Sequence, residues 1–414
     1  MAMKESGIEW VGLIPDTWSV IPNKYVMHKE KNLCEKWTGE DVMSLTMNGV
    51  IVRDLQNPTG KMPATFDGYQ YIEDGDLLMC LFDIDVTPRC VGRVTHLGVT
   101  SPAYSNFKVH DNASRDYFYY YYLMVDNTKE LLHLAKNLRH SFTEEQLGQL
   151  KVPMPPLSEQ QAIADYLDET CSKIDEIIAE AKASIDEYKE LKQSVIFEAV
   201  TKGLDKNVEM KQCSVNWLDE IPSTWESIRL KYLLTEINNR SETGTEQPLS
   251  VSQVMGVVPS YMIAVANPTA SYVGQKIVEP NDIVFNKLKA HLGVFFMSKY
   301  HGLVSPDYAV YRTNDKVIPK YLEYLFHTSA CISEFKKYIS GVAEGLMRLY
   351  TSDLFNIRIC LPKVDEQIKI VEYVENKVEL FNSLISEKEF LINDLEAYKK
   401  SLIYEVVTGK RRVV

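Results

Sequence analysis

The sequence has no apolar run approaching the ~18–20 residues that a membrane-spanning helix needs. Its first twelve residues include Lys4, Glu5 and Glu9 and lack the apolar core of a secretory signal. The seven cysteines are scattered and form no Cys-x-x-Cys pair, which argues against a zinc site or a disulfide scaffold. We therefore expect a cytoplasmic protein whose thiols stay reduced.

Motifs of the common nucleotide enzymes are also missing. No G-x-x-x-x-G-K-[ST] loop is present to hold phosphates, and no Asn-Pro-Pro-aromatic tetrad is present to hold a flipped adenine for methylation. The eight histidines form no Ser/His/Asp or Cys/His set. Asp205, Glu209 and Lys211 superficially suggest a magnesium nuclease, but they lie in an expected linker. The sequence thus predicts a chain that is not an enzyme and that binds no metal or cofactor.

An overall excess of cations is missing as well, since the formal net charge is −12. Half of this excess, a net −6, lies in residues 156–207, whereas residues 208–360 are neutral. Non-specific coating of nucleic acid requires many cations to neutralise phosphates. The charge argues against that function, but it leaves room for local basic faces.

The sequence does contain a long internal repeat. The segment Trp10-Val-Gly-Leu-Ile-Pro-Asp-Thr-Trp18 recurs, shifted by 207 positions, as Trp217-Leu-Asp-Glu-Ile-Pro-Ser-Thr-Trp225. The same shift places Glu159-Gln160 on Glu366-Gln367. Solenoid repeats have periods of about 20–50 residues. A period of this length indicates two copies of a whole domain, each followed by one long element.

That element is predicted to be a long helix in each copy, because apolar residues recur at heptad spacing over more than four heptads. Ser158 and Gln161 fit a capping box at the start of the first helix, and Gly203 and Gly409 fit the two ends. The expected coiled-coil positions are Leu167, Ile174, Ile178, Ile185, Tyr188, Val195, Val374, Val378, Phe381, Ile385, Ile392, Leu395, Leu402 and Val406.

The partner of each helix is expected to be the other helix. A linker of 14 residues, from Gly203 to Asn216, reaches at most ~50 Å, so the second copy must begin near the far end of the first helix. The second helix then returns antiparallel, with approximate twofold symmetry. The alternative is that each helix packs against another chain.

The remaining parts, 18–155 and 225–360, are predicted to be mixed α/β (α+β) domains. Short apolar runs after turn signals, at 76–82 and 282–285, are typical of strands, and helices are expected to begin at 117–123 and 321–326. The tyrosine run at 117–122 could stack on bases, but a helix that packs its aromatic face into the core is the favoured interpretation.

Basic side chains cluster near the ends of these elements in both copies. Arginine and lysine neutralise phosphates, and arginine also pairs with guanine edges. A solvated surface is the alternative for any one cluster. The candidate DNA-binding residues are Arg89, Arg93, Lys136 and Arg139 in the first copy, and Lys287, Lys289, Lys336, Lys337 and Arg348 in the second.

In its repeated motifs the sequence resembles the specificity (S) subunit of type I restriction–modification systems. The motifs are the two Trp…Ile-Pro-x-Thr-Trp segments, Val152-Pro-Met-Pro-Pro-Leu-Ser-Glu-Gln160, Ile359-Cys-Leu-Pro362 with Glu366-Gln367, Glu198-Ala-Val-Thr-Lys-Gly203 and Glu405-Val-Val-Thr-Gly-Lys410. The resemblance implies target-recognition domains at 1–155 and 204–360, the latter with its linker, and spacer helices at 156–203 and 361–414. Each domain would read one half of a bipartite, asymmetric double-stranded DNA site.

The resemblance also implies partners. Two methyltransferase (M) subunits would dock on the helices and use S-adenosylmethionine, and two motor–nuclease (R) subunits would use ATP and Mg²⁺. One departure concerns the glycine–arginine loop Gly341-Val-Ala-Glu-Gly-Leu-Met-Arg348, whose first-copy counterpart around Arg139 lacks the glycines. Two other functions stay open, namely an acidic scaffold or DNA mimic that binds restriction enzymes, and a stand-alone methyltransferase or nuclease.

Overall fold

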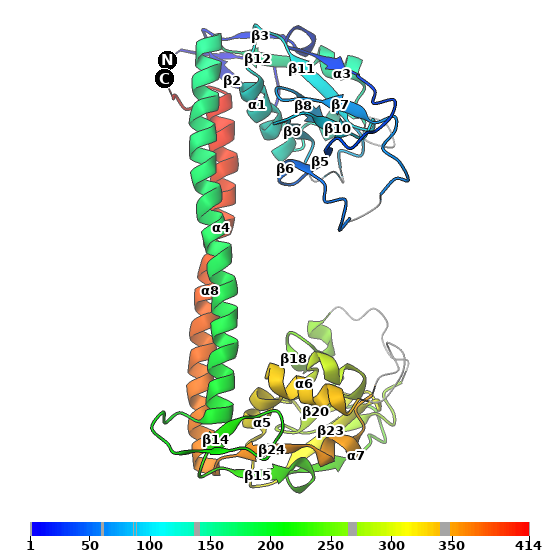
Figure 1. Ribbon diagram of the computed structural model, residues 1–414, viewed down its shortest axis with the longest axis vertical. Coiled ribbons are helices and arrows are strands. Elements are labelled where there is room, and N and C mark those ends of the chain that lie inside the picture. The colour runs from blue at the N-terminus through cyan, green and yellow to red at the C-terminus, as the bar shows by residue number, and fades with distance from the viewer. Residues whose placement is uncertain are drawn as a thin grey trace. The chain divides into compact units, whose positions relative to one another are not determined.

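The computed structural model describes residues 2–58, 62–85, 87, 89–135, 141–263, 271–339 and 348–413. The chain forms two compact units (Figure 1). Unit 1 comprises Met1–Lys182 and Glu389–Val414, and unit 2 comprises Ala183–Lys388. The part of unit 1 before the first long helix is called domain 1, and the part of unit 2 between the two long helices is called domain 2.

Domain 1 is built on two four-stranded sheets, of order β6-β5-β10-β7 and β4-β11-β8-β9. Two shorter antiparallel pairs, β1 with β2 and β3 with β12, complete its strands. In chain order its elements are β1 (Met3–Glu5), β2 (Leu13–Pro15), β3 (Ser19–Pro22), η1 (Asn23–Tyr25), β4 (Met27–Glu30), β5 (Val42–Thr46), β6 (Gly49–Val52), β7 (Gln70–Ile72), β8 (Leu77–Met79), β9 (Val91–Arg93), β10 (Gly98–Thr100), β11 (Ser105–Val109), α1 (Arg115–Asn127), α2 (Leu131–Leu134), α3 (Glu144–Gln149) and β12 (Lys151–Met154).

Domain 2 repeats the second of these sheets as the order β16-β23-β20-β21. The antiparallel pairs β13–β14, β15–β24, β17–β18 and β19–β22 surround it. In chain order its elements are β13 (Met210–Gln212), β14 (Glu220–Pro222), β15 (Glu226–Arg229), η2 (Leu230–Tyr232), β16 (Leu234–Ile237), β17 (Leu249–Ser252), β18 (Gly256–Pro259), η3 (Ser260–Met262), β19 (Lys276–Val278), β20 (Ile283–Asn286), η4 (Lys287–Leu292), β21 (Phe295–Met297), β22 (Gly302–Val304), β23 (Tyr308–Thr313), α5 (Pro319–Phe326), α6 (Ser329–Lys337), α7 (Thr351–Asn356) and β24 (Arg358–Leu361).

The long helices are α4 (Leu157–Lys202) and α8 (Val364–Val407), and each follows the last strand of its domain. Both mixed α/β domains and both long helices were predicted from the sequence, and the structure confirms them. The start of α4 differs from the prediction, because the helix begins at Leu157, before the expected cap at Ser158. The backbone N–H of Gln160 already donates to the carbonyl of Pro156, and the Gln161 side chain donates to Asp165. The capping box prediction is therefore wrong.

The repeated Trp-Glu motif joins each domain to the start of its own long helix. The buried indole of Trp18 donates its N–H to Glu159 at 3.0 Å, and Trp225 donates to Glu366 at 3.1 Å. A buried indole needs such an acceptor, and the first turn of a helix favours a carboxylate through its dipole. This contact explains why tryptophan and glutamate recur together at the 207-residue shift.

The glutamine beside each glutamate joins the domain to its helix a second time. Gln160 accepts the backbone N–H of Ser114, just before α1, and donates to the carbonyl of Pro155. Gln367 makes the equivalent bonds to the backbone of Ile318 and Pro362. Both amides are fully buried, so their hydrogen bonds satisfy backbone groups that would otherwise be costly to bury.

Each domain also binds the end of the other long helix. In unit 1 the Tyr117 hydroxyl donates to the carbonyl of Val407, in the last turn of α8. In unit 2 the Tyr321 hydroxyl donates to the carbonyl of Val200, near the end of α4. Val200 and Val407 are 207 positions apart, so both copies use the same bond. Each domain therefore contacts the first turn of one helix and the last turn of the other.

Within each unit α4 and α8 run antiparallel (Figure 1). In unit 1, Asp175 of α4 pairs with Lys399 of α8 at 2.6 Å. In unit 2 the equivalent positions, Asn382 and Lys192, are 3.0 Å apart. Since the two pairs are related by the 207-residue shift, one antiparallel register holds in both units. The alternative, that each helix pairs with another chain, is not supported.

The predicted seam residues lie toward the interior. The buried ones are Leu167, Ile174, Ile178, Ile185, Val374, Ile392, Leu402 and Val406, and the half-buried ones are Tyr188, Val195, Val378, Phe381, Ile385 and Leu395. The ring of Tyr188 packs against that of Phe381 in unit 2. Each helix ends at a glycine with positive φ, Gly203 after α4 and Gly409 after α8. A Cβ on Gly409 would meet Pro15 at 2.5 Å, so glycine is needed there.

Candidate nucleic-acid interface

Basic residues of domain 2 gather around the short helix η4, between β20 and β21. Asn286 begins this helix by accepting the N–H groups of Leu288 and Lys289 with its side chain. The N–H of Leu349 bonds to the carbonyl of Lys287, which brings the exposed Arg348 beside η4. Three predicted DNA-binding residues, Lys287, Lys289 and Arg348, thus lie together although Arg348 is 59 positions farther along the chain.

The basic side chains of this cluster differ in their exposure and in whether a carboxylate lies beside them. Lys289 and Arg348 are exposed, whereas Lys287 is half-buried and lies 3.3 Å from the carboxylate of Glu236. Lys336 and Lys337 are exposed on the last turn of α6, a helix that packs against η4, and Lys337 pairs with Glu334. Lys289, Lys336 and Arg348 are therefore the residues of the five whose charges are exposed and not shared with one of these carboxylates.

Sequence reasoning missed Lys276, a lysine that is 4% exposed on β19. Its Nζ donates to the carbonyl of Tyr308 at 2.7 Å, and its backbone bridges to that of the exposed Arg240. Burial lowers the pKa of this ammonium and the nearby charges of Lys287 and Arg240 lower it further, while Glu236 and Asp307 act in the opposite direction. Lys276 and Arg240 thus extend the basic cluster around η4.

Comparison with the first copy separates the structural hydrogen bond of Lys276 from its charge. At the position of Lys276 it has Gln70, whose side-chain amide donates at 2.8 Å to the carbonyl of Tyr104, the counterpart of Tyr308. A neutral amide therefore makes the same bond, and the charge of Lys276 is not needed for it. Aligning the two copies places Gln70 opposite Lys276. This difference is the signal in the sequence that could have identified Lys276.

Arg89 is half-buried and lines a groove within unit 1, between domain 1 and the long helices. Lys129, Lys182, Lys399 and Lys400 line the same groove, together with acidic residues that include Asp126 and Glu396. Two other predicted residues of the first copy, Lys136 and Arg139, lie outside the described residues. Their role stays a prediction.

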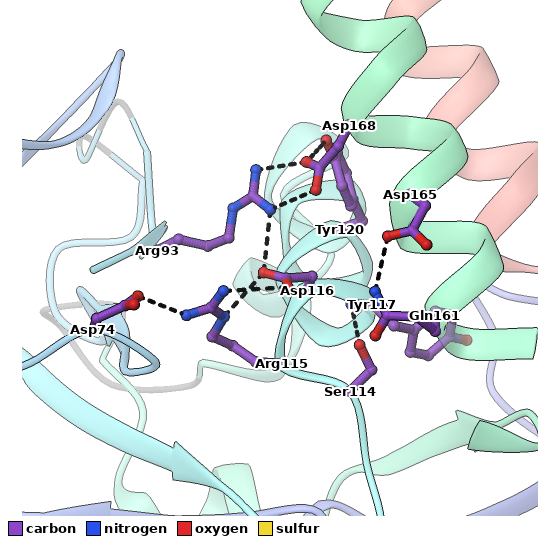
Figure 2. Close-up of polar contacts among 10 residues, drawn as sticks. All are labelled: Asp74, Arg93, Ser114, Arg115, Asp116, Tyr117, Tyr120, Gln161, Asp165 and Asp168. Carbon is purple, nitrogen blue, oxygen red and sulfur yellow. Dashed lines mark hydrogen bonds and ion pairs between the residues drawn. The ribbon is translucent and has the colours of Figure 1, made fainter. Parts of the chain in front are cut away.

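Arg93 lies in a network of carboxylates, which Figure 2 shows. Its guanidinium makes two hydrogen bonds to Asp168 of α4, at 2.7 and 3.0 Å, and one to Asp116 of α1 at 3.1 Å. It also lies over the ring of Tyr119, 4.5 Å from the ring centre. The fork that would pair with a guanine edge is thus already occupied by a carboxylate.

The network holds Asp168 ionised. Burial raises the pKa of this carboxyl, but the hydrogen bonds from Arg93 and Tyr120 outweigh burial and leave the pKa below its ordinary value. The Tyr120 hydroxyl donates to Asp168 at 2.7 Å, and its pKa is raised by burial and by that bond. Arg115 joins the network by pairing with Asp74 and Asp116. These contacts are typical of an internal ionic link between a domain and a helix.

The tyrosine run of α1 serves the core, as the favoured interpretation of the sequence predicted. The rings of Tyr117, Tyr120, Tyr121 and Tyr122 are all buried. Among the described residues no group of three or more acidic, histidine or cysteine side chains could hold a metal ion. In the same part of the chain, no helix combines the length and the apolar character that crossing a membrane would require.

The chain is similar in sequence to one family and several curated proteins. Residues 91–187 and 222–393 match the family described as type I restriction modification DNA specificity domain. The putative type I restriction enzyme MjaX specificity subunit of Methanocaldococcus jannaschii is 24% identical over 316 residues, 73% of this chain and 69% of the relative. The EcoKI specificity subunit of Escherichia coli is 24% identical over 242 residues, 55% of this chain and half of the relative.

Two solved structures are similar in fold. One is described as the structural basis of complex assembly and conformational transition of the type I R-M system; it has a TM-score of 0.71 and 14% identity, over 96% of this chain and 99% of that chain. The other is the HsdS subunit from Thermoanaerobacter tengcongensis, with a TM-score of 0.57 and 16% identity, over 96% of this chain and 98% of that one.

Proposed function

Because the chain belongs to the family of type I restriction–modification DNA specificity domains, we propose that its two domains read the two halves of one bipartite DNA sequence. The family match covers parts of both copies, and the curated relatives are specificity subunits of type I restriction enzymes. DNA recognition is therefore the function of this chain. The DNA-mimic alternative finds no support in these relatives.

The doubled architecture is the observation that carries the proposal for two half-sites. Each domain has the same tryptophan, glutamate and tyrosine bonds to the long helices, whereas Lys276 of the second copy stands where the first copy has Gln70. Two domains that contact the helices in the same way but carry different basic residues are suited to read different sequences.

We expect Arg89→Ala to weaken recognition of one half-site and Lys287→Ala to weaken recognition of the other.

The long helices are proposed to set the distance between the half-sites. A helix of 46 residues, such as α4, is about 69 Å long at ~1.5 Å per residue. Paired helices of fixed length and register cannot slide without breaking pairs such as Asp175–Lys399. The spacing between half-sites then becomes a geometric property of the protein, as in dimeric DNA-binding proteins.

The helices are also proposed to dock two methyltransferase (M) subunits, with two motor–nuclease (R) subunits joining for cleavage. Large apolar side chains are exposed along them in acidic surroundings, namely Ile177, Leu191, Leu380, Phe390, Leu391 and Tyr398. Exposed apolar residues on an otherwise polar helix are typical of a protein interface. Acidic helices are poor ligands for DNA, so protein partners suit them better.

We propose that this chain is not itself an enzyme. S-adenosylmethionine, ATP and Mg²⁺ would then be bound by the partner subunits. Methyl transfer by the isolated chain would contradict this proposal.

A gel-shift assay with the M partner present tests the proposed function. A ternary complex on DNA that contains the bipartite site is expected, whereas a mimic would compete with DNA for the partner. Sequencing of methylated adenines in a host that carries the system would then identify the two half-sites. Methylation at single, unpaired sites would contradict the two-domain proposal.

A further inference from the structure

Domain 1 contacts α4 at two separate positions along the helix axis. The first contact is the Trp18–Glu159 bond at the start of the helix, and the second is the Arg93–Asp168 pair. Glu159 and Asp168 are nine residues apart, which corresponds to about 14 Å along the helix. A domain held by one contact can tilt relative to the helix about that contact. Two contacts at different positions along the helix oppose this tilt.

Domain 2 has the first contact and lacks the second. Strand register places Met297 at the position of Arg93, since both residues pair with the first residue of the preceding strand, Ile283 or Leu77. The position of Asp116 is taken by Lys320, which pairs with Glu323 of its own helix. Between the described residues of domain 2 and those of α8, no ion pair is present. The ionic link is thus particular to the first copy.

The link is built from several groups that act on one carboxylate. Asp168 accepts two bonds from Arg93 and one from Tyr120, and Asp116 holds the other side of the guanidinium. The Arg93 and Asp168 side chains are 28% and 40% exposed, so salt screens their attraction only in part. Planar bidentate pairs also fix orientation, which a single point charge does not.

We infer that Arg93 is a positioning residue, which through Asp168 holds domain 1 at a fixed tilt on α4 and thereby fixes where its half-site must lie. This inference rests on the proposed function, because the tilt matters only if domain 1 reads DNA. Arg93 then determines which spacing between half-sites is accepted, and it does not determine which bases are recognised. Domain 2 has no such ionic link and is held on the long helices by the hydrogen bonds of Trp225, Gln367 and Tyr321 and by apolar packing against α8.

The test measures adenine methylation by the complete complex with M subunits, on DNAs whose spacer is native or one base pair longer or shorter. Wild type is expected to methylate the native spacer only. For Arg93→Met, which introduces the residue of the second copy, we expect methylation of the altered spacers to rise about tenfold, while the native site and its bases are retained. Arg93→Lys, which keeps the charge without the fork, should show a smaller rise.

Asp168→Asn and Glu375→Gln complete the test. Asp168→Asn should reproduce Arg93→Met, and Glu375→Gln, at the matching position of α8, should leave spacing unchanged. Thermal melting of each variant reports folding, so that Asp168→Asn decides the matter if Arg93→Met fails to fold. Wild-type spacing preference in folded Arg93→Met and Asp168→Asn would overturn the inference, as would an altered base preference, which would mark Arg93 as a DNA contact. Failure of wild type to methylate any bipartite site would instead overturn the proposed function.

Discussion

At the scale of single residues, the two copies act as controls for each other. Where both copies keep a residue, as with the tryptophans and tyrosines that contact the long helices, its role in the fold is the same in each unit. Where they differ, as with Gln70 and Lys276, the shared bond to a backbone carbonyl separates structure from charge. The substituted residues are therefore the ones to test for DNA recognition.

Replacement of Lys276 by the residue of the first copy is expected to weaken DNA binding without unfolding domain 2. Lys276→Gln keeps a donor for the Tyr308 carbonyl and removes one cation from the cluster around η4. Because Lys276 is buried, its charge acts on DNA through the field of the cluster and not by direct contact, so we expect the slope of log affinity against log salt to fall by less than one. Titrations of the complex with DNA at several salt concentrations measure this slope.

Removal of one tyrosine hydroxyl should destabilise its own unit. Tyr321→Phe leaves the carbonyl of Val200 without its donor in a buried site, which costs about 1–2 kcal/mol. Tyr117→Phe should have a similar cost in unit 1, through the carbonyl of Val407. Denaturant unfolding measures both values. A change below a few tenths of a kcal/mol would contradict the role assigned to these bonds.

At the scale of elements, each domain is mounted on the helices by its last strand, its first helix and one tryptophan. The strand pairs β3–β12 and β15–β24 have matching registers, with Ser19 opposite Met154 and Glu226 opposite Leu361. Each pair feeds the chain directly into a long helix. The mounting elements are thus shared between the copies, whereas the ionic link through Arg93 and the cluster around η4 each belong to one copy.

The ionic link predicts a dependence of stability on pH in unit 1. The pKa of Asp168 in the folded chain lies below its ordinary value, so its contribution is fully present above about pH 4 and is lost as the pH falls through the folded pKa. Asp168→Asn should remove this part of the dependence. The melting temperatures of wild type and Asp168→Asn between neutral pH and pH 3 provide the measurement. Parallel curves would contradict the prediction.

The exposed apolar residues predict where a partner binds. Phe390, on α8, is 67% exposed, so Phe390→Ser should change stability little, while it weakens assembly with the M subunit by about tenfold. Glu389→Gln, at the neighbouring position, is the matched control and should assemble normally. Sedimentation or titration calorimetry of the two subunits measures the affinity. Unchanged assembly of Phe390→Ser would exclude this face as the docking site.

At the scale of the whole molecule, each domain contacts, within its own unit, the start of one long helix and the end of the other. The same register, Asp175 with Lys399 and Lys192 with Asn382, holds in both units. This shared register supports the spacing rule that we propose, in which helix length sets the distance between the half-sites.

Lengthening both helices should change the preferred DNA spacer. One heptad inserted after Lys182 and another after Lys388 adds about 10.5 Å, or about three base pairs at 3.4 Å per pair. Methylation should then be optimal on a spacer about three base pairs longer than native. Insertion into one helix alone should break the register and abolish activity. An unchanged optimum in the double insertion would contradict the spacing rule.

Much of the architecture could be predicted because repeats and heptads are linear patterns. The shift of 207 residues and the 4-3 spacing of residues such as Leu167 and Ile174 are present in the order of amino acids, and helix pairing follows from burying that stripe. The partner of a particular arginine or lysine is not a linear property. Arg93 was expected to be free for DNA, but the folded chain brings Asp168, 75 residues away, within 2.7 Å.

Lys276 shows the same limit, because strand pairing buries this lysine and brings it beside Arg240, which is distant in the chain. The sequence thus establishes the duplication, the long paired helices and the family. The three-dimensional packing of strands and helices assigns each charge its partner, since electrostatic attraction depends on distance in space and on burial, and neither is written in the spacing of residues.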